Sequence, residues 1–177
     1  LQGANDIIAE WISEKTFVRS SARNYFERNA VLRSKVVKGK EDEAQKYANY
    51  FDSSDVVRKC ASHRILAMLR GEKEGLLKLQ IVVDDAEIID KITKFVVKGN
   101  GESSNFVAEA VKDSYKRLIK PSIEREIRSD LKDKAEDKAI YNFGKNLEAL
   151  LLTPPMKEKV VLAFDPGFVN GCKLAVV

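Results

Sequence analysis

The aspartate that follows a short apolar run near the end of the chain points most directly to chemistry. Asp165 comes after the apolar segment 160–164 and precedes Pro166 and Gly167. Two-metal phosphoryl-transfer sites present their first ligand in this way, as a carboxylate leaving a buried strand. Magnesium needs several oxygen ligands, and the sequence places one here. The alternative is an ordinary strand-ending turn, because Asp, Pro and Gly are common turn residues.

Two basic stretches supply candidate contacts to nucleic-acid phosphates, which Lys and Arg neutralise with salt-dependent affinity. The first comprises Arg33, Lys35, Lys38 and Lys40, and the second comprises His63, Arg64, Arg70 and Lys73 around a helix–Gly–strand corner. The alternative is a solvated face, or arginines tied to the nearby Glu72 and Glu74. In segment 112–138 acids and bases interleave at helical spacing, which indicates an exposed, solubilising face.

The other chemistry-bearing residues form no recognisable site in the sequence. Cys60 and His63 have C-x-x-H spacing, but a structural zinc ion needs four ligands and only Cys172 remains of that type. We therefore expect no metal and no cofactor. The glycines form no G-x-S-x-G, no P-loop and no G-x-G-x-x-G. Two cysteines are too few for a disulfide scaffold.

The composition is that of a charge-coated globular protein. The 177 residues are 44% hydrophobic and 33% charged, which argues against wholesale disorder. No run of about 18 uncharged apolar residues is present, so no segment is expected to span a bilayer. The net charge of +4 permits nucleic-acid binding without requiring it. The chain begins without Met and ends on an apolar run, and we expect it to be a piece of a longer protein.

The elements that position these residues are expected to be mostly helices. Apolar periodicity predicts helices at 5–12, 16–28, 38–51, 62–71 and 84–98, and almost without pause over 103–152. Helix caps are predicted at Asn5–Asp6 and Ser62, and Asp84–Asp85 is expected to open a helix. Pro121 is expected to open a long amphipathic helix of roughly 30 residues. Strands are predicted at 77–83, 160–164 and 172–177, and the β-branched segment 31–37 is expected to be a short strand or an extended connection.

Several segments, each weak alone, resemble one family in their ordered combination. They are 3–10, 34–40, 62–67, 70–75, 113–119, 121–126, 165–168 and 171–173. Over essentially the whole chain they resemble the Tex family of bacterial transcription accessory proteins. That family is similar to the core of a eukaryotic transcription elongation factor and histone chaperone.

The resemblance implies a long protein in which a central helical region precedes a YqgF domain of RNase H-like fold. Helix-hairpin-helix elements and an oligonucleotide-binding-fold RNA-binding domain follow. Asp165 then takes the first acidic position of the RNase H-like fold. Val169–Asn170 replace the Arg–Thr that often follows at this point, which weakens any phosphate contact there. The YqgF domain of this family is regarded as lacking a full nuclease site, so the resemblance implies no enzyme.

The predicted fold class is mainly α: a multi-helix module with a few short strands and one long helix, followed by an incomplete RNase H-like β-hairpin. Two consecutive prolines, Pro154 and Pro155, mark the clearest boundary, because they stop the helix. We predict a central helical module with short strands over 1–102 and a long helical connector over 103–153. A linker and the truncated start of the YqgF domain follow over 154–177.

The expected function is that of a helical scaffold that positions nucleic-acid-binding domains within a cytoplasmic transcription accessory protein. The expected partners are RNA or DNA, bound weakly, and the transcription machinery, with no membrane. Two alternatives remain open. One is a metal-dependent nuclease that uses Asp165 in the full-length protein. The other is a protein-interaction module that docks transcription or translation machinery.

Overall fold

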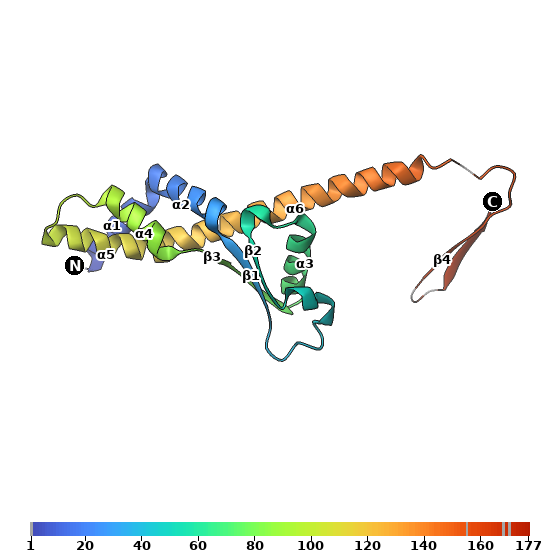
Figure 1. Ribbon diagram of the computed structural model, residues 1–177, viewed down its shortest axis with the longest axis horizontal. Coiled ribbons are helices and arrows are strands. Elements are labelled where there is room, and N and C mark those ends of the chain that lie inside the picture. The colour runs from blue at the N-terminus through green and yellow to red at the C-terminus, as the bar shows by residue number, and fades with distance from the viewer. Residues whose placement is uncertain (1, 155, 168, 170) are drawn as a thin grey trace. The chain divides into compact units, whose positions relative to one another are not determined.

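The computed structural model describes residues 2–154, 156–167, 169 and 171–177 (Figure 1). Helices predominate over a few short strands, which confirms the mainly α fold class. The chain forms two compact units, Leu1–Ile140 and Tyr141–Val177.

The helices of the first unit contribute to a shared hydrophobic core. They are α1 (Gln2–Glu14), α2 (Thr16–Asn29), α3 (Ser62–Lys73), α4 (Asp85–Val96), α5 (Glu102–Asp113) and the first part of α6 (Lys120–Leu151). Ile12, Phe26, Ile88 and Val111 are almost fully buried in this core. The predicted helices at 16–28 and 84–98 are confirmed, because each places its apolar stripe on these neighbours.

The two predicted helix caps are wrong, whereas the helix expected to open at Asp84–Asp85 is confirmed. The Asp84 carboxylate accepts hydrogen bonds from the N–H groups of Ala86 (2.9 Å) and Glu87 (3.4 Å) at the start of α4. Helix α1 already begins at Gln2, so Asp6 lies inside it. Ser62 is the first residue of α3 and its side chain makes no capping bond. Asp6 therefore lies past the first turn of α1, and the N-cap position of α3 is taken by Ala61.

A three-stranded antiparallel sheet runs beside the helices in the order β2–β1–β3 (Figure 1). Its strands are β1 (Val31–Val36), β2 (Asp52–Val56) and β3 (Leu77–Val82). The predicted strand at 77–83 is confirmed, and segment 31–37 forms a strand. Strand β2 was not predicted, because its sequence is rich in Asp and Ser, which are uncommon in strands. This segment is extended because its backbone pairs with β1 along its whole length.

The predicted helix over 38–51 is wrong. Turns and a short 3₁₀ helix, η1 (Gln45–Tyr50), occupy this segment. The N–H of Val36 donates to the carbonyl oxygen of Phe51 (3.0 Å), so the chain must return to its starting point. A straight helix of this length would span about 20 Å and could not do so. The apolar residues expected on the helix instead form a small second core, in which Ala44 and Tyr47 pack on Leu76 and Leu77.

Gly71 lets α3 lie close to the buried face of the sheet. A Cβ atom at this position would stand 2.6 Å from Cδ1 and 2.9 Å from Cγ of Leu77 in β3. Gly75, with φ of +71°, then turns the chain from the end of α3 into β3. Gly75 therefore follows the end of α3, whereas Gly71 lies inside the helix and allows close packing.

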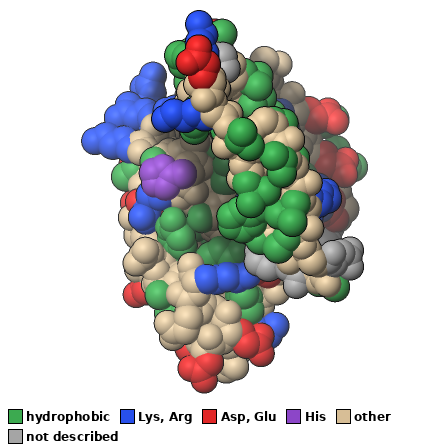
Figure 2. Space-filling view, turned by 90° about the vertical axis from the view of Figure 1, so that its right-hand side faces the viewer, with side chains coloured by type: hydrophobic (Ala, Val, Ile, Leu, Met, Phe, Trp, Pro, Cys, Tyr) green, Lys and Arg blue, Asp and Glu red, His purple; other side chains and the backbone are tan. Residues whose placement is uncertain are grey.

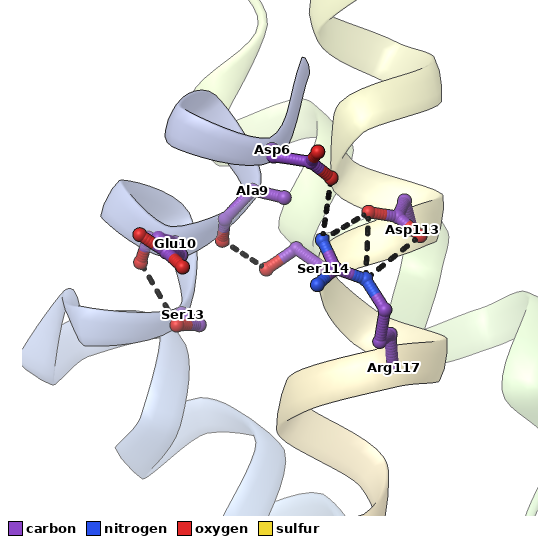
Figure 3. A network of polar contacts seen from close by, with 7 residues as sticks. All are labelled: Asp6, Ala9, Glu10, Ser13, Asp113, Ser114 and Arg117. Carbon is purple, nitrogen blue, oxygen red and sulfur yellow. Dashed lines mark hydrogen bonds and ion pairs between the residues drawn. The ribbon is translucent and has the colours of Figure 1, made fainter. Parts of the chain in front are cut away.

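A π-helical turn, η3 (Ser114–Ile119), joins α5 to α6. Pro121 lies in the first turn of α6, as predicted, and the wider turn before it accommodates a ring that would clash with a carbonyl one turn back. Figure 3 shows how η3 holds α1: the buried Ser114 hydroxyl donates to the Ala9 carbonyl oxygen (2.7 Å). Arg117 reaches Asp6 (3.0 Å) and Asp113 (2.9 Å) on the surface beside it.

The second unit contains the end of α6 and the antiparallel hairpin of β4 (Leu162–Pro166) and β5 (Cys172–Val176). The prediction of a buried strand at 160–164 is wrong in this structure, since Leu162 and Phe164 are 63% and 65% exposed. Among the described strands, β4 pairs only with β5. Figure 2 shows hydrophobic side chains gathered on the face that is turned toward the viewer. Of the predicted boundary residues, Pro155 lies outside the described residues, as do Phe168 and Asn170 of the predicted loop.

Candidate nucleic-acid interface

One face of the three-stranded sheet is open to solvent and carries cations from two strands. In β1 the buried residues Leu32 and Ser34 alternate with the exposed residues Arg33 and Lys35. Cross-strand partners share a face of a sheet. The exposed face therefore also carries the partners of Arg33 and Lys35, which are Ser54 and Asp52 in β2 and Gln80 and Lys78 in β3. Lys78 is a basic residue that sequence reasoning did not include.

The cations of this face lack acidic partners, as do several other basic residues of the first unit, but they stand together on one sheet surface. Among the described residues, Arg33, Lys35 and Lys78 make no ion pair. By contrast, Lys91 and Lys94 on α4 each pair with an acid one turn away. Positive charge without a bound carboxylate remains available to neutralise phosphate.

The structure brings part of the second basic stretch to the end of this face. The Lys40 ammonium donates to the carbonyl oxygen of Gly75 (3.2 Å), which joins the turn after β1 to the end of α3. Lys38 and Lys73 are exposed on the two joined segments and make no ion pair within the described chain. The two predicted basic stretches thus meet at Lys40 and Gly75.

Arg70 is exposed in the last turn of α3, next to an acidic group. The hydrogen bond from Lys46 holds the pKa of Glu74 below its ordinary value, and the charge of Arg70 adds to this effect. The Lys46 ammonium lies 2.7 Å from the Glu74 carboxylate. The ion pairs of Glu74 and Glu72 are with Lys46 and Arg128, and among the described residues neither acid forms an ion pair with Arg70.

Arg64 does not join the exposed sheet face. Its guanidinium lies 2.8 Å from the carboxylate of Asp55, which is the cross-strand partner of the buried Leu32. It also lies over the ring of Tyr50, 5.1 Å from the centroid. The hydrogen bond to Asp55 raises the pKa of Arg64. Arg64 thus belongs to the helix-covered side of the sheet, and His63 is exposed beside it.

The predicted first acid, Asp165, is exposed in β4 opposite Lys173 of β5. Within the described residues, no group of three or more His, Cys, Asp or Glu side chains is arranged to hold a metal ion. Cys60 is half-buried, and this burial raises the pKa of its thiol. No helix in the described part of the chain has the length and apolarity needed to cross a membrane.

Comparisons with known proteins agree with the resemblance seen in the sequence. The family described as Tex central region-like matches residues 1–143. The chain is 43% identical to the uncharacterized protein YdcI of Bacillus subtilis, over 99% of this chain and 25% of that protein. It is 33% identical to the protein tex of Bordetella pertussis, over 100% of this chain and 24% of that protein.

A human relative extends the comparison beyond bacteria. The chain is 29% identical to S1 RNA-binding domain-containing protein 1 of Homo sapiens, over 99% of this chain and 19% of that protein. The chain thus spans a quarter or less of the length of these relatives. Because the family match covers most of its residues and the relatives align along all of it, the chain belongs to the Tex family.

Proposed function

We propose that this chain binds nucleic acid weakly and without sequence preference through the exposed face of its sheet, as part of a transcription accessory protein. The observation that carries this proposal is the row of cations without acidic partners, Arg33, Lys35 and Lys78, on one solvent-facing sheet surface. A relative is named a transcriptional accessory protein and another an S1 RNA-binding domain-containing protein, which supports the same class of function.

The chemistry of the face favours contacts to the backbone of a nucleic acid over contacts to its bases. Lysine and arginine neutralise phosphates, and the hydroxyl of Ser54 and the amide of Gln80 can hydrogen-bond phosphate or sugar oxygens. The described strands place no aromatic side chain on this face, and base stacking on aromatic rings is what single-strand platforms use to add affinity. Affinity is therefore expected to be low and to depend strongly on salt.

The second part of the proposal is a scaffold role for α6. This helix has 32 residues, which corresponds to a length of about 48 Å at 1.5 Å per residue. Ile123, Ile127 and Ala135 bury its first part in the core of the first unit. Its later apolar residues, such as Phe143 and Leu150, are exposed. We propose that α6 carries the nucleic-acid-binding domains of the longer protein and that hairpin β4–β5 begins a YqgF domain of RNase H-like fold.

Titration of a fluorescently labelled single-stranded RNA with the chain tests the binding proposal. We expect a dissociation constant in the range of about 10⁻⁶ to 10⁻⁴ M at physiological salt, which is usual for nonspecific binding. Replacing Arg33, Lys35 and Lys78 together with Ala should reduce this affinity strongly. The matched control replaces Lys91, Lys94 and Lys112, which all pair with acids, and removes the same charge. Equal loss in both variants would overturn the proposal.

A further inference from the structure

The outer edge of β3 offers unpaired backbone groups. β3 is an edge strand whose only partner in the described sheet is β1. The N–H of Val37 donates to the Leu76 carbonyl oxygen (2.9 Å), so even-numbered residues of β3 face β1. The N–H and C=O groups of Leu79 and Ile81 therefore point away from the sheet, and Val83 is the first residue after the strand. No hydrogen bond to the backbone of these three residues is made from outside the β1–β3 pair within the described chain.

The outer edge of β3 forms one side of a groove. The cavity has a volume of about 600 Å³ and is lined by residues 79–83 and by the first turns of α6. Leu79 is buried, and Ile81 and Val83 are half-buried, so the floor is apolar beside the open backbone groups. The other edge strand, β2, is different, since Asp52 and Asp55 place charge along it and charged edges discourage pairing.

The charged groups on the α6 side of the groove are mostly paired. The Lys120 ammonium lies 2.7 Å from the Asp85 carboxylate, and Arg128 forms an ion pair with Glu72. Arg125 is exposed; its Nε donates to the Pro121 carbonyl oxygen (3.1 Å), and among the described residues it has no carboxylate partner. The free charge of the wall is therefore that of Arg125, next to the half-buried carboxyl of Glu124.

We propose that an extended segment of a partner protein binds in this groove as an additional strand on β3, with an acidic side chain facing Arg125. Alternating N–H and C=O groups at an open edge are what an added strand recognises, and side-chain pockets beside the edge give specificity. The free guanidinium of Arg125 supplies charge complementarity to the acidic residue. This site is separate from the exposed sheet face proposed to bind nucleic acid.

Two other occupants fit the groove less well. A nucleic acid would bring phosphates against Asp85 and Glu124, and it has no alternating donors and acceptors to match a strand edge. A second copy of the chain would have to bring its own α6 against this α6, because the same helix flanks each copy of β3. A single extended segment meets neither obstacle.

Selection from a phage-displayed library of random peptides of about ten residues, a length typical of long strands, tests the proposal. The chain serves as bait, and the selected peptides are then synthesised and labelled. We expect enrichment of sequences that alternate apolar and polar residues, carry a central acid and lack central proline. Hydrogen exchange of the Ile81 and Val83 amides should slow when such a peptide binds. Failure to enrich any peptide that protects these amides overturns the proposal.

Two proline substitutions test whether the peptide binds at the edge of β3 or at the edge of β2. Val83→Pro removes the N–H of the residue that directly follows β3, where an added strand would continue its pairing. Val56→Pro removes an outward N–H of β2, where φ of −62° already suits proline. Val83→Pro should weaken peptide binding about tenfold, the equivalent of one lost hydrogen bond, and Val56→Pro should leave it unchanged. Equal affinity for both variants contradicts strand addition at β3.

Arg125→Glu provides a second variant that does not alter the backbone. It should reverse the preference of the groove, so that a peptide with a central Lys binds better than one with a central Asp. An unchanged preference would contradict the assigned role of Arg125. Competition with a single-stranded oligonucleotide and sedimentation of the free chain complete the test. Slowed exchange of the Ile81 and Val83 amides with the oligonucleotide, or in a dimer, would assign the groove to that occupant and reject the peptide.

Discussion

Lys35 in β1 and Lys78 in β3 are direct cross-strand partners on the exposed face of the sheet. Like charges in this position repel and destabilise an antiparallel pair. Asp52, on the other side of Lys35, offsets part of the repulsion, but no acid of the described sheet stands directly opposite Lys78. An anion bound between the two ammonium groups would offset their mutual repulsion. This surface is therefore suited to binding a phosphate.

Charge reversal at Lys78 should therefore separate stability from binding. In Lys78→Glu the repulsive pair becomes an attractive one, and we expect the free energy of unfolding to rise by about 0.2–1 kcal/mol. The same substitution removes a phosphate contact and adds repulsion, so RNA affinity should fall. Urea unfolding and an RNA titration on the same preparation measure the two effects. Unfolding at lower urea together with unchanged RNA binding would contradict this interpretation of the face.

Two glycines in helices should respond to alanine in opposite directions. Gly71→Ala places a Cβ atom 2.6 Å from Leu77, and we expect a loss of about 1–3 kcal/mol through overpacking. Gly144 in α6 has no atom within 4 Å of the corresponding Cβ position. Gly144→Ala should therefore raise helix stability by about 0.5–1 kcal/mol. Thermal unfolding followed by circular dichroism measures both changes. A stabilising Gly71→Ala would show that α3 and β3 do not approach this closely.

The buried hydroxyl of the π-helical turn should matter more than an exposed one nearby. Ser114→Ala removes the bond to the Ala9 carbonyl oxygen, and we expect a loss of about 0.5–1.5 kcal/mol. The control is Ser13→Ala, which removes an exposed bond to the Glu10 carbonyl oxygen (2.8 Å) and should change stability far less (Figure 3). Chemical unfolding of the three proteins gives the comparison. Similar losses in both variants would argue against η3 as the anchor of α1.

Asp85 should make part of the stability depend on pH. Burial alone would raise its pKa, but hydrogen bonds from Lys120 and Tyr115 outweigh burial and hold the pKa below its usual range. A lowered pKa in the folded state means that the ionised form is stabilised, so the contribution is present above about pH 4 and is lost as the pH falls through the folded pKa. Asp85→Asn should thus be less stable than the wild type at neutral pH.

The difference in unfolding free energy between the wild type and Asp85→Asn should shrink as the pH falls below the usual carboxyl pKa. Asp90→Asn is the control, because Asp90 is exposed and pairs only with Lys94 one turn away. Unfolding free energies measured between about pH 7 and pH 3 test the prediction, a window that follows from the usual carboxyl pKa. A difference that stays constant with pH would show that Asp85 contributes through packing and not through its charge.

Local sequence patterns predicted the elements that are held by local signals. The β-branched residues of β1, the period-two alternation of β3, Asp84 at the start of α4 and Pro121 all specify their structures within a few residues. The segment 38–51 and strand β2 could not be predicted in this way, since the pairing of Val36 with Phe51 decides both. Likewise, the Asn5–Asp6 and Ser62 patterns predicted caps, but α1 begins at Gln2 and the N-cap of α3 is Ala61.

The candidate site was predicted in part for the same reason. Lys35 and Lys38 were selected from the first basic stretch, and the structure leaves both exposed and without acidic partners in the described chain. Lys78 was missed because its relevance comes only from the register that places it opposite Lys35. Arg64 was selected from its neighbours in sequence, but Asp55, which pairs with it, lies on a strand that the sequence did not reveal.

The dependence of RNA affinity on salt is the most direct test of the central claim. The logarithm of the association constant should fall linearly with the logarithm of salt concentration, with a slope that counts the phosphates neutralised. In the variant with Ala at Arg33, Lys35 and Lys78, we expect the slope to become shallower by about two to three, close to one for each lost contact. The control variant with Ala at Lys91, Lys94 and Lys112 should keep the wild-type slope. Identical slopes in all three proteins would contradict binding at the sheet face.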